Sequence, residues 1–185
     1  MSNVIEYVTM SSEGNATDFG DLAANRSGFG SCGNTTRGVF SGGSYTSTSN
    51  VIDYITIAST GNVTDFGDLT VARTWVASGV AASSTRGLTF GGADAGWSYS
   101  NVIDYITIAS TGNATDFGDL TSIRSLVFST SNATKAVCGR DAWIYDNNID
   151  VVTIASTGNA TDFGDLVTGL RGQVGACGGQ GGLTA

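Results

Sequence analysis

Eight carboxylates of the chain are arranged as four close pairs, each within the motif Thr-Asp-Phe-Gly-Asp-Leu. Two neighbouring carboxylates can act as the acid and base of a glycosidase or, with carbonyl oxygens, bind Ca²⁺. Acid–base catalysis needs two carboxyl groups in unlike environments, whereas four near-identical motifs give four like environments. Calcium stays an alternative only if the loop can fold around the ion and supply its about six to eight oxygens. The pairs are Asp18/Asp21, Asp65/Asp68, Asp116/Asp119 and Asp162/Asp165.

The repetition of this motif favours a structural role for its side chains. We expect the carboxylates to cap tight turns or to pair with the arginine that follows in three copies, which is Arg26, Arg73 or Arg124. The Phe of each motif is expected to pack between neighbouring repeats. Asp-Phe-Gly is also a metal-binding triplet of protein kinases, but the glycine-rich loop, strand lysine and His-Arg-Asp that accompany it are missing here.

Histidine is absent from the sequence, which removes the commonest general base and the commonest transition-metal ligand. The pairs Gly42-Gly43 and Gly91-Gly92 are not followed by Lys-Ser/Thr, so they indicate bends rather than a phosphate cradle. An enzyme would need one unique polar cluster, and the strands expected to line a central channel offer Phe29, Trp75 and small residues instead. We therefore predict a non-enzymatic protein without catalytic residues, metal or cofactor.

The net charge of −8 repels nucleic-acid phosphates, so no nucleic-acid binding is predicted. No apolar run approaches the length of a transmembrane helix and no signal peptide is recognisable, so membrane insertion is not expected. The three cysteines lack the spacing of a zinc site or a disulfide framework. Cys32 and Cys177 lie at equivalent repeat positions and are expected to be small buried hydrophobic residues.

Aromatic residues stand out in the segments where the copies differ, SYTSTS, ADAGWSYS and DAWIYDN. Aromatic rings beside Ser, Asn and Asp on variable loops suit stacking on sugar rings or contact with another protein. The alternative is that each ring covers the glycine-rich backbone of its own repeat. The predicted ligand-binding residues are Tyr45, Trp97, Tyr99, Trp143 and Tyr145.

These motifs belong to a repeat that occupies nearly the whole chain of 185 residues. The segment NVIDYITIASTGNATDFGDL and its close variants start at Asn3, Asn50, Asn101 and Asn147. Its first half alternates and is rich in β-branched and aromatic residues, which predicts a strand. Ser-Thr-Gly-Asn predicts a turn, and the motif with the Asp pair predicts a short outer strand. Two further strands, one of small residues and one ending in Gly-Gly, complete each unit.

We therefore predict an all-β protein with little or no helix, folded as a small β-propeller of four blades. Residues 1–185 form one domain, with units at about 1–23 plus 171–185, 24–73, 74–124 and 125–170. Pairing of the N- and C-terminal strands would close the ring and remove exposed sheet edges. An open solenoid, or a partial ring that closes only as a dimer, is the alternative.

The order of these strands resembles the kelch repeat. The Gly-Gly after an apolar strand and the Tyr in the strand downstream match that pattern. The Trp usual in the last kelch strand is missing, and the Phe of the Asp-Phe-Gly motif takes roughly its place. The fourth copy also has Gly139-Arg140 where the others have Gly-Gly. The resemblance implies kelch-like propeller blades.

The amino-acid sequence of the repeat also resembles repeats in tail-fibre and other virion-surface proteins of bacteriophages. That resemblance implies a virion structural or adhesion protein, assembled in the host cytoplasm, which presents a rigid docking or receptor-binding face. Its expected partners are other virion proteins or copies of itself, with a host-surface glycan as a further partner. A free-standing, lectin-like carbohydrate-binding module is the alternative.

Overall fold

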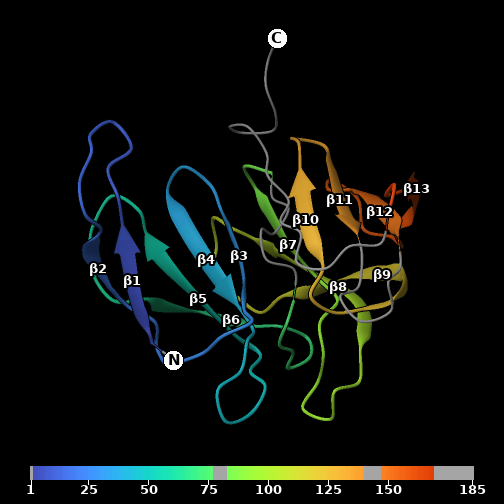
Figure 1. The fold of residues 1–185 in the computed structure, drawn as a ribbon, viewed down its shortest axis with the longest axis horizontal. Helices are drawn as coiled ribbons and strands as arrows, with labels where there is room; N and C mark the ends of the chain where they lie inside the picture. The colour runs from blue at the N-terminus through green and yellow to red at the C-terminus, as the bar shows by residue number, and fades with distance from the viewer. Residues whose placement is uncertain (1, 77–82, 140–146, 169–185) are drawn as a thin grey trace.

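The fold in the computed structural model is built entirely of β-strands and connecting segments across the described residues, which are 2–76, 83–139 and 147–168 (Figure 1). None of these residues belongs to a helix that could span a membrane. The all-β class predicted from the sequence is therefore confirmed. The strands are β1 Val4–Tyr7, β2 Thr17–Asp21, β3 Gly30–Gly33, β4 Arg37–Ser41, β5 Val51–Thr56, β6 Thr64–Asp68, β7 Arg86–Phe90, β8 Ser100–Thr107, β9 Thr115–Arg124, β10 Phe128–Ser131, β11 Lys135–Gly139, β12 Asn148–Thr153 and β13 Thr161–Asp165.

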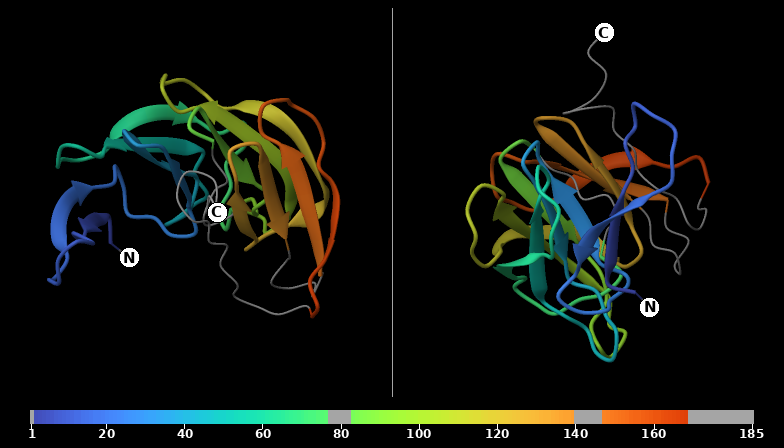
Figure 2. Two further views of the ribbon diagram at one scale, coloured as in Figure 1. Left: turned by 90° about the horizontal axis from the view of Figure 1, so that it is seen from above. Right: turned by 90° about the vertical axis from the view of Figure 1, so that its left-hand side faces the viewer.

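These strands form four antiparallel sheets, which we number in chain order. Sheet 1 is β1-β2, sheet 2 is β3-β4-β5-β6, sheet 3 is β7-β8-β9 and sheet 4 is β10-β11-β12-β13. Consecutive strands are neighbours in every sheet, so each repeat forms a meander. The sheets follow one another along an arc, with β1 and β2 at one end and β13 at the other (Figure 2).

The arc is not a closed ring in the part of the chain that the structure describes. Sheet 1 has only two strands there, and the strands predicted to complete it come from residues 171–185, which lie outside the described residues. Closure by pairing of the N- and C-terminal strands therefore stays a prediction.

The last two strands of each repeat form a hairpin with a bulge at the same place. In sheet 2 the register pairs Ile52 with Gly67 and Asp53 with Asp65, so that Phe66 has no partner on β5. Sheets 1, 3 and 4 have the same irregularity one repeat apart. A bulge bends its strand and redirects a side chain, and here Phe66 lies in a core shared with the next sheet.

A backbone contact, which we call the joint, connects each sheet to the next one. The N–H of Gly61 in the turn after β5 donates to Phe19 O of β2 (2.7 Å), and the Val63 N–H donates to Asp21 O (2.9 Å). Asn62 Oδ1 accepts the N–H of Asp21 (3.0 Å). In the joint, the Ser-Thr-Gly-Asn turn of one sheet thus supplies hydrogen-bond partners for the backbone N–H and C=O groups on the outer edge of the preceding sheet. Sheets 2 and 3 and sheets 3 and 4 make the same three bonds.

Apolar side chains pack beneath the joints between sheets 2 and 3 and between sheets 3 and 4. Between sheets 2 and 3, Phe66 and Ile52 pack in one cluster with Ile108 and Ile106. Between sheets 3 and 4, Phe117 packs in the equivalent cluster with Ile154. The predicted packing of Phe between repeats is confirmed for Phe66 and Phe117. Phe19 is buried as well, in contact with Tyr7 of its own sheet.

Three arginines lie buried at or just after the end of an outer strand: Arg26 and Arg73 in the segment that connects one sheet to the next, and Arg124 as the last residue of β9. Arg26 forms an ion pair with Asp53 (2.7 Å), Arg73 with Asp104, and Arg124 with Asp150 (3.3 Å). The predicted pairing of these arginines with the Asp-Phe-Gly-Asp carboxylates is therefore wrong. The partner is the Asp in the strand β5, β8 or β12, and this carboxylate is buried in all three sheets.

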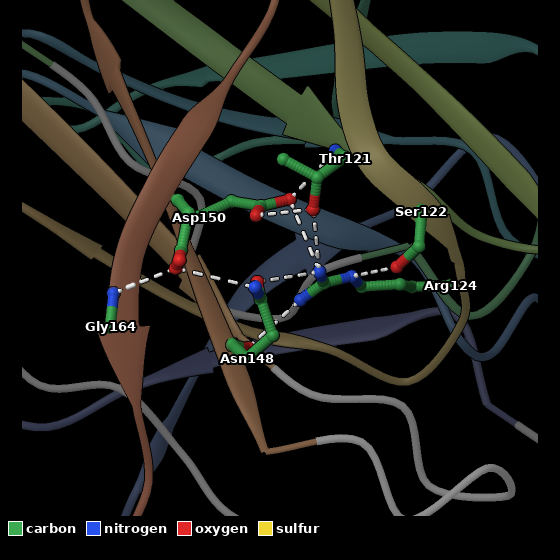
Figure 3. Close-up of polar contacts among 7 residues, drawn as sticks. Thr121, Ser122, Arg124, Asn148, Asp150 and Gly164 are labelled. Atoms are coloured by element: carbon green, nitrogen blue, oxygen red, sulfur yellow. Dashed lines mark hydrogen bonds and ion pairs between the residues drawn. The ribbon is translucent and has the colours of Figure 1, made fainter.

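Each arginine also donates hydrogen bonds to backbone carbonyl groups of the next sheet. Arg73 Nη1 donates to Gly91 O (2.7 Å) and Val102 O (2.8 Å), on either side of the bend after β7. In sheet 4, which has no Gly-Gly bend, Arg124 instead donates to Asn148 O (3.0 Å) and Asn148 Oδ1 (2.8 Å) (Figure 3). Thr121 Oγ1 donates to Asp150 (2.7 Å) in the same network.

The predicted capping role of the paired carboxylates is confirmed for the first Asp of three pairs. Asp18, Asp116 and Asp162 each accept the backbone N–H of the glycine two residues further on, at 3.1, 3.2 and 2.9 Å. These carboxylates are exposed, so they shape the bulge without being buried.

We predict that Gly67→Ala destabilises the fold by about 1–3 kcal/mol more than Gly61→Ala does. Both glycines have a positive φ, +144° and +150°, so the cost of adding a side chain to that backbone conformation is matched. A Cβ at Gly67 would lie 2.5 Å from the carbonyl carbon of Gly112 in the joint, whereas one at Gly61 meets nothing within 4 Å. Urea unfolding of the two variants measures the difference, and equal losses would contradict the role of the joint.

We also predict that Arg73→Met lowers the free energy of unfolding by about 3–5 kcal/mol. The substitution leaves the carboxylate of Asp104 buried without its cation. The control is the double variant Arg73→Met/Asp104→Leu, which removes both charges and should recover part of the loss. Chemical denaturation checks both, and a double variant no more stable than Arg73→Met would argue against an unpaired charge as the cause.

Candidate functional site: an aromatic groove between two sheets

Three aromatic side chains line one groove between the loops of sheets 2 and 3. The groove has a volume of about 390 Å³, and Tyr45, Trp75 and Trp97 lie along it together with Ser and Thr residues. Tyr45 and Trp97 are exposed, whereas Trp75 is half-buried. We call this feature the aromatic groove. Its remaining lining residues are Ser27, Ser44, Thr46, Ser47, Thr48, Thr74, Asp94 and Ala95.

The loop that carries Tyr45 is held in place by the connection between sheets 1 and 2. Ser44 exchanges both backbone hydrogen bonds with Ser27 (2.9 Å each) and also bridges to Thr48. Gly43, with φ +100°, starts this loop, and a Cβ there would lie 3.0 Å from Ser27 O. The Gly-Gly bend is therefore needed for the close approach of the two segments.

The loop that carries Trp97 is built in the same way, one repeat further on. Ala93 bridges to Thr74 in the connection between sheets 2 and 3, and also to Tyr99. Asp94 Oδ1 accepts the N–H groups of Gly96 (2.8 Å) and Ser98 (2.9 Å), which closes the loop into a tight turn. This turn presents Trp97 toward the groove.

The two tryptophans are in direct contact. The centres of the Trp75 and Trp97 rings are 4.4 Å apart and the ring planes are inclined at 39°. Both residues have left-handed backbone conformations, with φ values of 54° and 64°. That conformation costs a non-glycine residue about 1–2 kcal/mol. Backbone strain of this kind persists where the surrounding structure fixes it, and it is concentrated at functional sites.

A second hollow of about 420 Å³ lies on the other side of Tyr45. It is lined by that ring, by Ala23, Ala24 and Asn25 of the connection, and by the ion pair of Arg26 and Asp53. Burial raises the pKa of the Asp53 carboxyl, and the positive charge of Arg26 offsets part of this effect. Tyr45 thus lines both hollows, one with the two tryptophans and one with the buried ion pair.

The structure places the predicted ligand-binding residues in three different situations. Tyr45 and Trp97 share the aromatic groove. Tyr99 takes part in the bridge that closes the Trp97 loop and does not line the groove. Trp143 and Tyr145 lie outside the described residues.

Trp75 is the functional residue that the sequence reasoning missed. It was expected in a strand lining a central channel, yet it lies in the connection between sheets 2 and 3 and stacks against Trp97. The signal was its position two residues after Arg73, since Arg26 and Arg73 are both buried in connections between sheets. Phe29 likewise precedes β3 and contacts Phe40 edge-on, with ring centres 5.9 Å apart.

The arrangement is suited to binding. The groove offers flat rings for stacking and hydroxyl groups for hydrogen bonds, which is the combination that orients small polar ligands. Among the described residues there is no cluster of three or more side chains suited to holding a metal ion. A comparison with protein-family models and with curated protein sequences finds no match.

We predict that Trp97→Gly is about 1 kcal/mol more stable than Trp97→Ala. Both variants lose the contact with Trp75, but only glycine adopts the backbone φ of 64° without strain. Thermal or urea unfolding measures the difference. An alanine variant as stable as the glycine variant would show that the left-handed conformation is not maintained in solution.

Proposed function

We propose that this chain is a non-enzymatic binding protein that uses the aromatic groove to hold a glycan. In this proposal the four sheets are kelch-like propeller blades, and the protein is a structural or adhesion component of a virion. The observation that carries the proposal is the convergence of Tyr45, Trp75 and Trp97 on one groove rimmed by Ser and Thr hydroxyls.

The chemistry of the groove supports a carbohydrate ligand. Sugar rings present C–H groups on one face, which pack on aromatic rings, and hydroxyl groups at their edges, which bond to Ser and Thr. Asp94 is the charged side chain that lines the groove, and the chain has a net charge of −8. A neutral glycan therefore fits better than a sulfated or sialylated one, because like charges repel.

The rigidity of the groove supports a role in adhesion. Its loops are fixed by backbone bridges to the connections between sheets, and its rings carry few rotatable bonds. Little conformational entropy is then lost when a ligand binds. The virion location rests on the resemblance of the repeat to bacteriophage surface proteins. It is tested by antibody labelling of purified particles that carry the chain.

The binding proposal is tested with a glycan array, followed by calorimetric titration of the glycans that bind. We expect neutral glycans to bind, and Tyr45→Ala and Trp97→Ala each to raise Kd at least about tenfold, as expected for aromatic contacts at the centre of a site. Ile123→Ser is the control, because Ile123 is an exposed apolar residue that does not line the groove. Binding that is unaffected by both aromatic substitutions, or the absence of any bound glycan, would contradict the proposal.

A further inference from the structure

The two ends of the arc carry the two halves of a joint. At one end, the outer strand of sheet 4, β13, has the same Thr-Asp-Phe-Gly-Asp sequence as β2 and β6. We call this surface the edge face. At the other end, sheet 1 has a turn with Gly14 and Asn15, which occupies the position of Ser-Thr-Gly-Asn in the other repeats. We call the surface around this turn the turn face. In Figure 2 these faces lie at opposite ends of the arc, in blue and in red.

The apolar residues of both faces are more exposed than their counterparts at the formed joints. Phe163 of the edge face is 61% exposed, whereas Phe117 at the formed joint is 2% exposed. On the turn face, Met10 is 96% exposed. At the equivalent position, Ile108 and Ile154 are buried and Ile57, at the joint between sheets 1 and 2, is 48% exposed. Val8 is exposed as well. Each face thus lacks the apolar partner that the other face possesses.

The backbone of the edge face is also open. At the joint between sheets 3 and 4, Gly158 N–H donates to Phe117 O (2.7 Å), and a Cβ at Gly118 would lie 2.5 Å from Gly158 O. At Gly164, which corresponds to Gly118, a Cβ would meet no described atom within 4 Å. The described residues therefore leave room against β13 for a turn of the Gly14–Asn15 kind.

A third contact, made at the joints between sheets 2 and 3 and between sheets 3 and 4, has a donor on sheet 4 for which the described residues supply no equivalent acceptor. Arg37 Nη1 of sheet 2 donates to Ile108 O of sheet 3 (2.8 Å), and Arg86 Nη1 of sheet 3 donates to Ile154 O of sheet 4 (2.9 Å). The equivalent cation on sheet 4 is Lys135, which lines a hollow of about 300 Å³. By the same register, its acceptor would be the Met10 carbonyl of a turn face.

We infer that the edge face of one copy binds the turn face of a second copy of this chain, head to tail. The arc holds the two faces of one copy apart, while their residues match the formed joints position for position. The contact is heterologous, since each copy contributes a different surface, so two or more copies complete a ring or extend a fibre. This inference stands apart from the aromatic groove, which lies between sheets 2 and 3.

The first test is the mass of the protein in solution, measured by light scattering. We expect at least twice the chain mass of 18.8 kDa. Phe163→Ser and Gly164→Ala should each reduce it to that of one chain, because one removes the apolar contact and the other places a Cβ where the turn must lie. The control is Val167→Ser, because Val167 is fully exposed beside the edge face. An unaltered mass in both edge variants overturns the inference.

The second test separates binding between copies from closure within one copy. Asn15→Cys and Asp165→Cys are made as separate single variants, mixed, and treated with a short bis-maleimide. The expected product is a cross-linked pair of chains from the mixture, and none from either variant alone. The positive control is Asp21→Cys/Asn62→Cys, because the same two positions meet at a formed joint with Asp21 N 3.0 Å from Asn62 Oδ1.

The native cysteines give little background in this experiment. Burial raises the pKa of the Cys32 and Cys138 thiols to about 12, so almost no reactive thiolate is present near neutral pH. Cys177 is replaced by Ser in all variants. If the mixture gives no pair, while the double variant Asn15→Cys/Asp165→Cys gives an internally cross-linked single chain, the ring closes within one copy and the inference is wrong. Absence of cross-links in both experiments, with the positive control linked, also overturns it.

Discussion

The fold depends on the way each sheet edge is satisfied by the sheet that follows it. An open edge carries unpaired N–H and C=O groups and invites pairing with other chains. Here a single turn, Ser-Thr-Gly-Asn, supplies N–H donors and an Asn carbonyl that complete the edge, and the glycines of both segments allow backbone to lie on backbone. The bulge at Phe-Gly belongs to the same device, because it sends the aromatic ring into the core shared by the two sheets.

The buried arginine is the second element that the arrangement needs. The residue lies at or after the end of the outer strand of one sheet. Its side chain bonds to carbonyl groups and to an aspartate of the next sheet. A buried ion pair contributes little net stability, but a misplaced one is costly. The pair therefore selects one geometry for the connection between sheets. The connection between sheets 2 and 3 also carries Trp75, and the connection between sheets 1 and 2 holds the Tyr45 loop. The packing between sheets therefore positions the aromatic groove.

The repeat allowed much of the fold to be predicted from the sequence. The alternating Val-Ile-Asp-Tyr-Ile-Thr segment, its turn and the Asp-Phe-Gly-Asp edge all form where their local patterns indicate. The partner of Arg73 could not be predicted, because Asp68 is nearer in the sequence and only the packing of the connection against sheet 3 brings Arg73 to Asp104. In the groove, Tyr45 and Trp97 were predicted from loop composition. Trp75 was missed, since only the path of the connection brings it to a loop of the next sheet.

The joints link each sheet only to its immediate neighbours, and this arrangement affects the order in which the sheets unfold. In such arrays, stability is divided between the units and the contacts that join them, so units at the ends open before those in the middle. Among the described residues, sheet 1 has two strands and is held by one joint, whereas sheets 2 and 3 are each held by two. The aromatic groove lies between those two central sheets, in the segment of the array that opens last.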